Sequence, residues 1–203
     1  MNAFEDQSFD LYVSVTTQTG YKKVILDFPN AYIELVENRG RDILPFIRML
    51  KIIDKLSYKS VCKIHSKRSI YRIDGDAIRE EILNQLLGSK EHVNDIISRF
   101  KNNEKLGIVV PQKYLFAHDD NNMTHNINQV NKIAKYLKLK FEYFVFPAGS
   151  MFWFSPRSLD LLLELDDTFF DIELGLADGT SAHAIERLFC NMVKHSNYLV
   201  ESC

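Results

Sequence analysis

Charged and small polar residues gather in four short segments, and each segment has side chains that could bind an anion or transfer a proton. The first segment is Asn38-Arg39-Gly40-Arg41-Asp42, and a predicted helix follows it. A helix N-terminus offers free backbone N–H groups, and arginine donates two parallel hydrogen bonds to a phosphate. The pattern predicts a phosphate site, although a turn that caps a helix and carries two solvated arginines would show the same residues.

The second segment is rich in basic residues and runs Lys63-Ile64-His65-Ser66-Lys67-Arg68. It leaves the end of a short apolar strand, so that several cations would lie close to one point. Such a group creates a strong local field for a diphosphate even in a mildly acidic protein. A solvated basic loop, with the histidine as a hydrogen-bonded structural residue, is the alternative.

The third segment combines small residues with aromatic ones. Gly149 and Ser150 would let a ligand approach the backbone, and the residues after them include Trp153, which is the single tryptophan. Aromatic rings bind the C–H face of a sugar or stack on a base. Core packing explains most aromatic runs, but alternation along a strand would leave half of these side chains free to line a cleft.

The fourth segment carries acids, an imidazole and an arginine near the start of the last predicted helix. Glu173 and Asp178 precede this helix, Thr180 stands at its N-terminus, and the helix then presents His183, Glu186 and Arg187 at positions i, i+3 and i+4. This spacing places the three side chains on one polar stripe. A capped surface helix with a weak ion pair has the same pattern.

Strands and helices alternate along the chain and must position these segments. Strands are predicted at 11–17, 31–36, 60–64, 106–110 and 141–146, and the first two are joined by a short link. Helices are predicted at 43–53, 78–86, 92–100, 127–137, 159–165 and 181–193, with Asp42 as the cap of the first. This alternation indicates an α/β/α domain with a largely parallel central sheet, whose ligands bind beyond the carboxyl ends of the strands.

The composition limits the class of protein. The 203 residues fit one domain covering 1–203, and 25 basic against 27 acidic side chains leave a net charge of −2. This balance argues against nucleic-acid binding through an overall basic field. Three dispersed cysteines argue against a zinc site or disulfides and favour a reducing compartment. Because there is no signal peptide and no apolar run of about 18 residues, we expect a cytoplasmic chain without a transmembrane segment.

Common cofactor and catalytic motifs are absent from the sequence. There is no GxGxxG, P-loop, GxSxG or HExxH motif, which leaves dinucleotide, NTPase, serine-hydrolase and zinc-protease functions without support. Asp119-Asp120 is the one acidic pair in a predicted loop, but it lacks the spacer of an Asp-x-Asp motif and does not end a strand. We therefore expect that no metal is required, with Mg²⁺ or Mn²⁺ as the alternative.

Four stretches together resemble a known family. They are ENRGRDILPF at 37–46, KIHSKRS at 63–69, PAGSMFWF at 147–154 and DGTSAHAIERLF at 178–189. In this order they are similar to the rhamnan synthesis protein F (RgpF-like) family of bacterial polysaccharide-assembly glycosyltransferases. The resemblance implies a role in building rhamnose-containing or related cell-surface glycans, such as O-antigen or capsule. It also implies a GT-A-like nucleotide-sugar-binding fold, here without the strand that would precede residue 9.

A glycosyltransferase of this kind needs cations at the leaving diphosphate and a carboxylate base at the acceptor hydroxyl. We expect Asp178 to be the base, with Glu173 and Glu186 as substitutes and His183 to orient it. The residues expected to bind substrate are Asn38, Arg39, Arg41, Asp42, His65, Lys67, Arg68, Gly149, Ser150, Trp153, Thr180 and Arg187.

The implied partners are a nucleoside-diphosphate sugar donor and a lipid-linked or oligosaccharide acceptor. Association with other transferases at the cytoplasmic face of the inner membrane would follow from the same role. Two alternatives stay open at this point: a non-catalytic module that binds glycan or nucleotide, and a structural subunit of a polysaccharide-assembly complex.

Overall fold

The first part of the fold is a parallel pair of strands joined by a helix. In the computed structural model, which describes residues 4, 8–66, 74–176 and 178–203, β1 (Tyr12–Val15) pairs with β2 (Tyr32–Leu35). Helix α1 (Gln18–Asp27) connects them, and the Thr17 hydroxyl accepts a hydrogen bond from the Gly20 N–H at its start. The prediction of a short link was wrong here. None of the α1 residues is buried, and hence the helix has no strong apolar periodicity to detect.

The central sheet has four strands in the order β3, β7, β4, β8. These are β3 (Val61–Lys63), β7 (Phe152–Phe154), β4 (Leu106–Val110) and β8 (Leu199–Ser202). Strand β7 runs antiparallel to both neighbours, and only β4 and β8 are parallel. The sheet is therefore mixed, which corrects the prediction of a largely parallel sheet.

The direction of β7 has a local cause. Strand β5 (Leu115–Ala117) pairs antiparallel with β6 (Val145–Pro147), and a short turn joins β6 directly to β7. Parallel neighbours require a crossover of a dozen or more residues, and no helix lies between β6 and β7 to provide one. The predicted strand at 141–146 is correspondingly shorter and begins later than expected.

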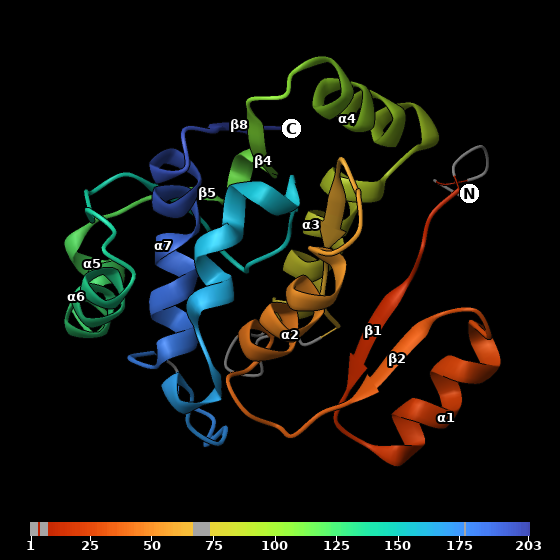
Figure 1. Ribbon diagram of the computed structural model, residues 1–203, viewed down its shortest axis with the longest axis horizontal. Helices are drawn as coiled ribbons and strands as arrows, with labels where there is room; N and C mark the ends of the chain where they lie inside the picture. Colours follow the sequence, from red (N-terminus) through yellow and green to blue (C-terminus); the bar gives the residue numbers. More distant parts are fainter. Residues whose placement is uncertain (1–3, 5–7, 67–73, 177) are drawn as a thin grey trace.

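Helices cover both faces of the central sheet, so that the expected α/β/α layering is present (Figure 1). Helices α2 (Ile43–Ile53) and α7 (Ser181–His195) pack on the face that includes Ile108 and Phe154. Helices α3 (Gly75–Leu87) and α4 (Lys90–Asn102) pack on the face that includes Val109 and Trp153. The alternation of strand side chains thus divides the core into two layers, one on each side of the sheet.

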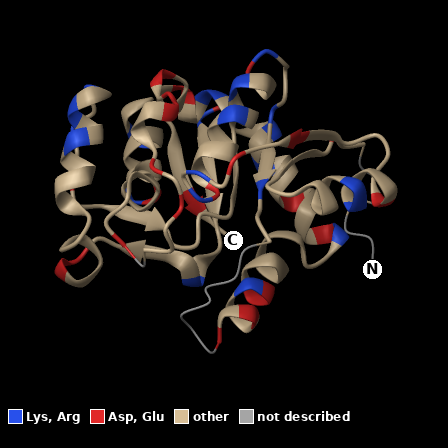
Figure 2. Cartoon of the chain, turned by 90° about the horizontal axis from the view of Figure 1, so that it is seen from below, with Lys and Arg blue, Asp and Glu red and all other residues tan. Residues whose placement is uncertain are grey.

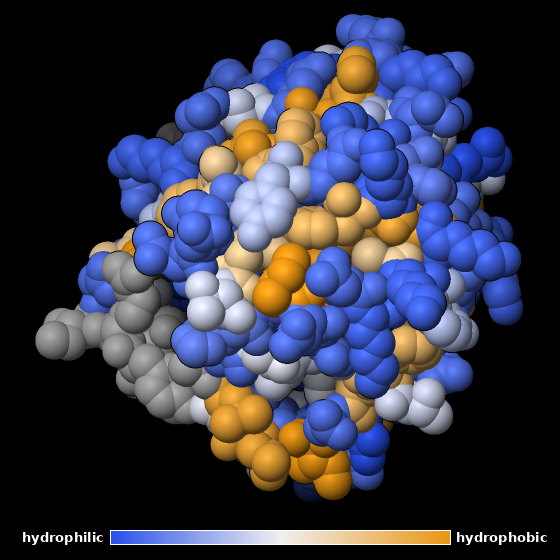
Figure 3. Space-filling model, turned by 90° about the vertical axis from the view of Figure 1, so that its left-hand side faces the viewer, coloured by the Kyte–Doolittle hydropathy of each residue, from blue (hydrophilic) through white to orange (hydrophobic). Residues whose placement is uncertain are grey.

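The remaining elements are short. Helices α5 (Asp120–Met123) and α6 (Ile127–Tyr136) lie beside α7, and Figure 3 shows that this side of the molecule is mostly hydrophilic, with small hydrophobic areas. Three 3-10 helices complete the chain at Gln112–Tyr114, Pro156–Glu164 and Asp167–Phe169, the second in place of the α-helix expected at 159–165. Within the described ranges, no helix combines the length and the apolar character that crossing a bilayer requires.

Candidate functional site

A left-handed turn after β2 directs Arg41 toward the last helix. Both Gly40 and Arg41 have positive φ, of 63° and 57°, and such backbone strain is typical of functional sites. A Cβ at Gly40 would lie 2.7 Å from side-chain atoms of Leu44 and Phe170, so that only glycine fits there. Arg41 Nη1 donates to His183 Nε2 at 2.6 Å, which joins the first and fourth segments.

A second left-handed turn, formed by Gly149 and Ser150, meets the first through Lys63. The φ angles of these two residues are 87° and 50°. The Lys63 ammonium lies 2.7 Å from Asp42 Oδ2 and donates to the Ser150 carbonyl at 2.6 Å, while the Ser150 hydroxyl donates to Asp42 at 3.0 Å. Asp42 was expected to cap α2, but its side chain makes no cap hydrogen bond and instead binds across to the other turn.

The Asp42 carboxyl stays ionised in this position. Burial alone would raise its pKa, but the charges of Lys63 and His65 and the hydrogen bonds from Lys63 and Ser150 outweigh burial, and the pKa lies well below the ordinary value. Lys63 is itself buried and lies over the rings of Phe46 and Phe152. The pair therefore links the two turns as opposite charges that are largely removed from solvent.

Glu186 binds the second turn from helix α7. Its Oε1 accepts the Gly149 N–H at 2.7 Å, and its Oε2 accepts from Arg187 Nη1 at 2.8 Å. The His65 ring donates to the Gly149 carbonyl at 2.9 Å, so both backbone groups of this glycine are held by side chains. Burial raises the pKa of Glu186 above its ordinary value, and the Arg187 charge and the Gly149 N–H offset this only in part.

The start of α7 holds the imidazole of the site. Thr180 caps the helix in a reciprocal arrangement with His183, and Asp178 Oδ1 lies 3.9 Å from His183 Nδ1 and 3.5 Å from Arg187 Nη2. Because a guanidinium only donates, Nε2 accepts from Arg41, while Nδ1 lies 2.8 Å from Thr180 Oγ1 and 3.3 Å from the Thr180 backbone nitrogen. Burial and the Arg41 charge lower the pKa of His183 to about 4, so the ring is neutral near pH 7.

These contacts form one continuous network, called here the ionic network, across segments that are distant in the chain. Its members are Arg41, Asp42, Lys63, His65, Gly149, Ser150, Glu173, Asp178, Thr180, His183, Glu186 and Arg187. Acidic and basic positions are interspersed over the elements in Figure 2, in keeping with the small net charge. All four predicted segments therefore contribute to the same place.

Some expected site residues lie elsewhere. Arg39 turns away from the network and donates to the Phe170 carbonyl, and Asn38 is exposed, with its carbonyl accepting the Glu173 N–H. Lys67 and Arg68 fall outside the described residues.

Trp153 packs in the core of the molecule. Its side chain is 3% exposed, and its indole N–H donates to the Leu86 carbonyl at 3.1 Å. The neighbouring strand residues Phe152 and Phe154 are fully buried on the opposite face. Because both faces of this central strand are covered by helices, neither face is free to line a cleft, and the expectation of a sugar platform at Trp153 is not supported.

The sequence patterns did not identify the roles of Lys63, which is a member of the network, or of Asn126 and His118, which support it. Lys63 belongs to the second segment, but its apolar strand gave no sign that the ammonium would face inward. Asn126 is fully buried and accepts the Gly179 N–H at 3.1 Å, which fixes the loop before α7. His118 donates to the Arg187 carbonyl at 3.0 Å, and its pKa is lowered by burial. A buried polar residue of this kind is recognised only once its partner is known.

A small pocket of about 110 Å³ opens beside Arg41. Arg41, Glu173 and Thr180 are among its polar residues, and Phe170 and Leu174 are among its apolar ones. Nucleotide-sized ligands occupy clefts of about 300–1,000 Å³. This pocket therefore holds part of such a ligand at most.

Carboxylates and imidazoles in the described ranges do not assemble into a metal centre. No group of three or more His, Cys, Asp or Glu side chains is arranged to hold an ion there. Asp119 of the acidic pair caps helix α5 through a reciprocal hydrogen bond with Asn122. Whether bound substrate brings a metal is a separate matter, and metal independence stays a prediction.

The fold and the ionic network define an α/β protein with a polar site at the ends of its strands. Comparison with known proteins makes this more specific. The family model for rhamnan synthesis protein F (RgpF) matches residues 1–198. The chain thus belongs to the rhamnan synthesis protein F family, a family named for polysaccharide synthesis.

Two proteins from Xanthomonas campestris pv. campestris are similar to this chain in sequence. The protein WxcX of strain B100, which is described as uncharacterized, is 35% identical over 178 residues, covering 84% of this chain and 25% of WxcX. WxcX of strain ATCC 33913 has the same identity and coverage. The chain thus spans about a quarter of the length of these relatives. No solved structure matches it.

Proposed function

We propose that this chain is a glycosyltransferase domain that transfers a sugar from a nucleoside diphosphate to a growing cell-surface polysaccharide. The observation that carries the proposal is the convergence of Arg41, His65, Lys63 and Arg187 with four carboxylates around two left-handed turns. Ion pairs removed from water contribute little net stability, because desolvation offsets their attraction. Their concentration at the ends of the strands therefore favours a role in binding and chemistry. The GT-A-like fold is part of this proposal.

The turns supply the groups that a leaving diphosphate requires. Arg41 lines the pocket, Arg187 lies in the first half of α7, and the N-terminus of this helix adds a partial positive charge. Each arginine is already paired with an acid, Arg41 with Glu173 at 3.8 Å and Arg187 with Glu186 at 2.8 Å. A bound diphosphate would take the place of Glu173 at Arg41, while Arg187 would keep its contacts with Glu186 and Asp178 and add positive charge nearby.

Asp178 is the base in this mechanism. The acceptor hydroxyl oxygen forms a bond to the anomeric carbon while the bond from that carbon to the diphosphate oxygen breaks, and the electron pair leaves with the nucleoside diphosphate. Asp178 takes the hydroxyl proton, and Arg187, 3.5 Å away, holds its carboxylate. His183 lies 3.9 Å from this carboxylate and binds Arg41 and Thr180 instead. With its side chain 28% exposed, Asp178 is open to an incoming acceptor. Glu186 instead positions the Gly149 turn, because both of its oxygens already accept hydrogen bonds.

A second candidate function is a binding module without catalysis, and the size of the pocket favours it. A volume of about 110 Å³ accommodates a phosphate or one sugar ring, but not a whole nucleotide sugar. In that case the rest of a longer chain would complete the site or carry the chemistry. If the chain binds a nucleoside-diphosphate sugar and does not release the sugar from it, this second function is favoured.

The decisive experiment measures donor binding and turnover separately. UDP- and dTDP-sugars are titrated calorimetrically into the wild type, Arg41→Gln and Arg39→Gln. Arg39→Gln is the matched control because Arg39 pairs with Glu37 and the Phe170 carbonyl rather than with a side chain of the network. We expect Arg41→Gln to weaken binding at least about tenfold, as the loss of one charged hydrogen bond predicts, and Arg39→Gln to bind as the wild type does. Equal losses in both variants would contradict the site.

Turnover is tested with Asp178→Asn in a donor-hydrolysis and transfer assay. The variant should bind donor within about twofold of the wild type and lose at least about a hundredfold in rate. Normal turnover would place the base elsewhere. The same assay with EDTA tests the metal expectation, since a strict requirement for Mg²⁺ or Mn²⁺ would overturn it.

A further inference from the structure

We infer that the β1–β2 sheet carries a second binding site, which takes the oligosaccharide acceptor and lies apart from the ionic network. It consists of Tyr12, Tyr32 and Tyr58 with the carboxylates of Asp10 and Glu34, and is called here the tyrosine cluster. Only the role as acceptor rests on the proposed function. The ability to bind an oligosaccharide follows from the geometry of these five side chains.

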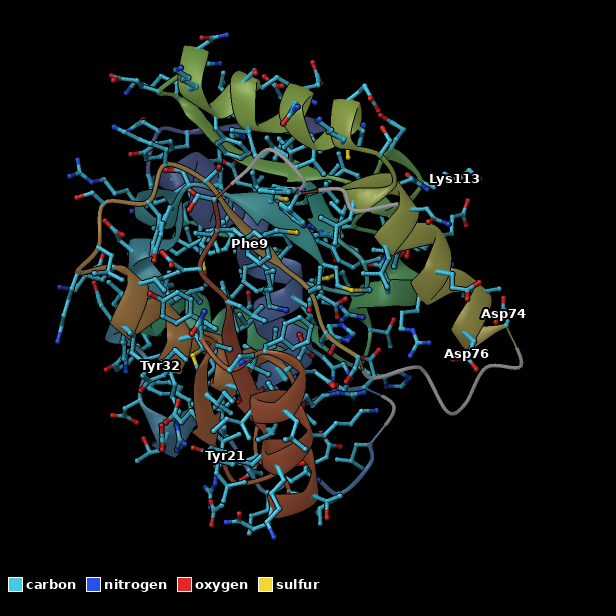
Figure 4. The ribbon with its side chains drawn as sticks, turned by 90° about the vertical axis from the view of Figure 1, so that its right-hand side faces the viewer. Phe9, Tyr21, Tyr32, Asp74, Asp76 and Lys113 are labelled. Carbon is cyan, nitrogen blue, oxygen red and sulfur yellow. The ribbon has the colours of Figure 1, made fainter. Side chains whose placement is uncertain are left out.

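The three rings form one aromatic surface at the start of the sheet. Tyr12 and Tyr32 are partners in the parallel register, with ring centroids 5.7 Å apart, and Tyr58 lies edge-on to Tyr12 at 6.2 Å. Tyr12 and Tyr58 also pack against the main core, which holds their rings in place, whereas Tyr32 is 46% exposed (Figure 4). A rigid aromatic surface that remains open to solvent is the element that binds the C–H face of a pyranose.

Hydroxyl groups and a carboxylate line the edge of this surface. The Tyr12 and Tyr58 hydroxyls lie 3.0 Å apart, and Tyr58 donates onward to the Asp10 carboxylate. Burial and these hydrogen bonds raise the pKa of Tyr58, which keeps its hydroxyl protonated at any physiological pH. The pair therefore presents fixed oxygen atoms that can accept hydrogen bonds from sugar hydroxyls.

Glu34 provides an acceptor that the rest of the described chain leaves unused. It follows Tyr32 by two residues in β2 and so projects from the same face of the sheet. Its Oε2 atom is buried and has no hydrogen-bond partner among the described residues, while the nearby Arg48 donates to Asp167 instead. A buried carboxylate oxygen needs a donor, and a ligand hydroxyl beside the tyrosine rings would supply it.

The chemistry of the cluster selects a carbohydrate over other ligands. Two carboxylates would repel the phosphates of a nucleic acid or of an anionic lipid surface. An apolar protein partner would instead match the exposed aliphatic side chains of this unit, but Leu35 points to the opposite face of the sheet and Leu26 belongs to α1. Neutral rings with many hydroxyl donors fit both the aromatic surface and its acceptors.

The test uses a synthetic rhamnose tetrasaccharide, because the family is named for rhamnan synthesis. It is titrated into the ¹⁵N-labelled chain by NMR and calorimetry, with the variants Tyr32→Ala and Glu34→Gln. We expect shifts in β1 and β2, and binding at least about fivefold weaker in each variant. Tyr143→Ala is the matched control, because that tyrosine is 57% exposed outside this sheet, and it should bind as the wild type does. Thermal unfolding checks that each variant is folded.

Several results would overturn the inference. These are no binding by the wild type, unchanged binding by Tyr32→Ala, a loss in Tyr143→Ala as large as in Tyr32→Ala, or a dimer of the wild type that Tyr32→Ala dissociates. The donor titrations keep the two proposals separate. If the tetrasaccharide binds at the cluster and no nucleoside-diphosphate sugar binds at Arg41, the proposed function fails and the glycan site stands.

Discussion

Removing the ammonium of Lys63 should destabilise the protein strongly. The Lys63 side chain is 4% exposed. Lys63→Met keeps most of its aliphatic part but leaves the Asp42 carboxylate and the Ser150 carbonyl without their donor. Breaking a buried ion pair at one partner costs about 3–5 kcal/mol, and the 20% exposure of Asp42 reduces this toward about 3 kcal/mol. For a chain of 203 residues this corresponds to a fall in Tm of about 6–12 °C.

The assay is urea unfolding followed by the fluorescence of Trp153, the single tryptophan, which is buried in the core. Lys113→Met is the matched control, because Lys113 pairs with Glu81 at the surface, and it should leave the midpoint unchanged. The double variant Lys63→Met with Asp42→Asn should recover at least about 1 kcal/mol, since the unpaired charge is gone. A loss below about 1 kcal/mol in Lys63→Met, or no recovery in the double variant, would refute the account of how the two turns are held.

Two further predictions concern the first turn and the imidazole. NMR titration of His183 should give a pKa near 4, and Arg41→Gln should raise it, because one of the charges that lower it is removed. The folded pKa of His183 lies below the unfolded value of 6.5, so the free energy of unfolding should fall as the pH drops from about 6.5 through 4. The variant His183→Gln should flatten this fall. An ordinary pKa for His183 would contradict the burial described here. Gly40→Ala should lower the free energy of unfolding by about 2–3 kcal/mol, because it adds backbone strain and an overlap with Leu44 and Phe170. Denaturant unfolding measures this loss. An effect under about 0.5 kcal/mol would mean that the turn relaxes freely and would contradict the prediction.

The elements with strong apolar patterns were predictable from the sequence. Strand β4 begins and ends at the predicted residues, and helices α2, α6 and α7 begin within a residue of the expected positions. Each has consecutive apolar residues or an apolar stripe that the core requires, and therefore the pattern and the packing coincide. Helix α1 and strand β8 lack such a pattern because much of their surface is exposed, and they were missed.

The convergence of the four segments was predictable, but the direction of their side chains was not. Segments that leave strand ends or begin helices meet at one place, as the contacts from Arg41 to His183 and from Gly149 to Glu186 show. The sequence could not distinguish Arg41 from Arg39, because the left-handed turn at residues 40 and 41 decides which guanidinium faces inward. In the same way, Trp153 is buried only because β7 lies between two other strands, which depends on long-range pairing.

The placement of β7 also affects how the protein is made. Among the described strands β3 has one neighbour, β7, which emerges about 90 residues later during synthesis. A nascent chain that ends between residues 111 and 151 therefore leaves β3 without β7 and leaves β4 without both of its neighbours, β7 and β8. Ribosome-stalled or truncated forms that stop there should be strongly dependent on chaperones, and translation past β7 and β8 should release that dependence.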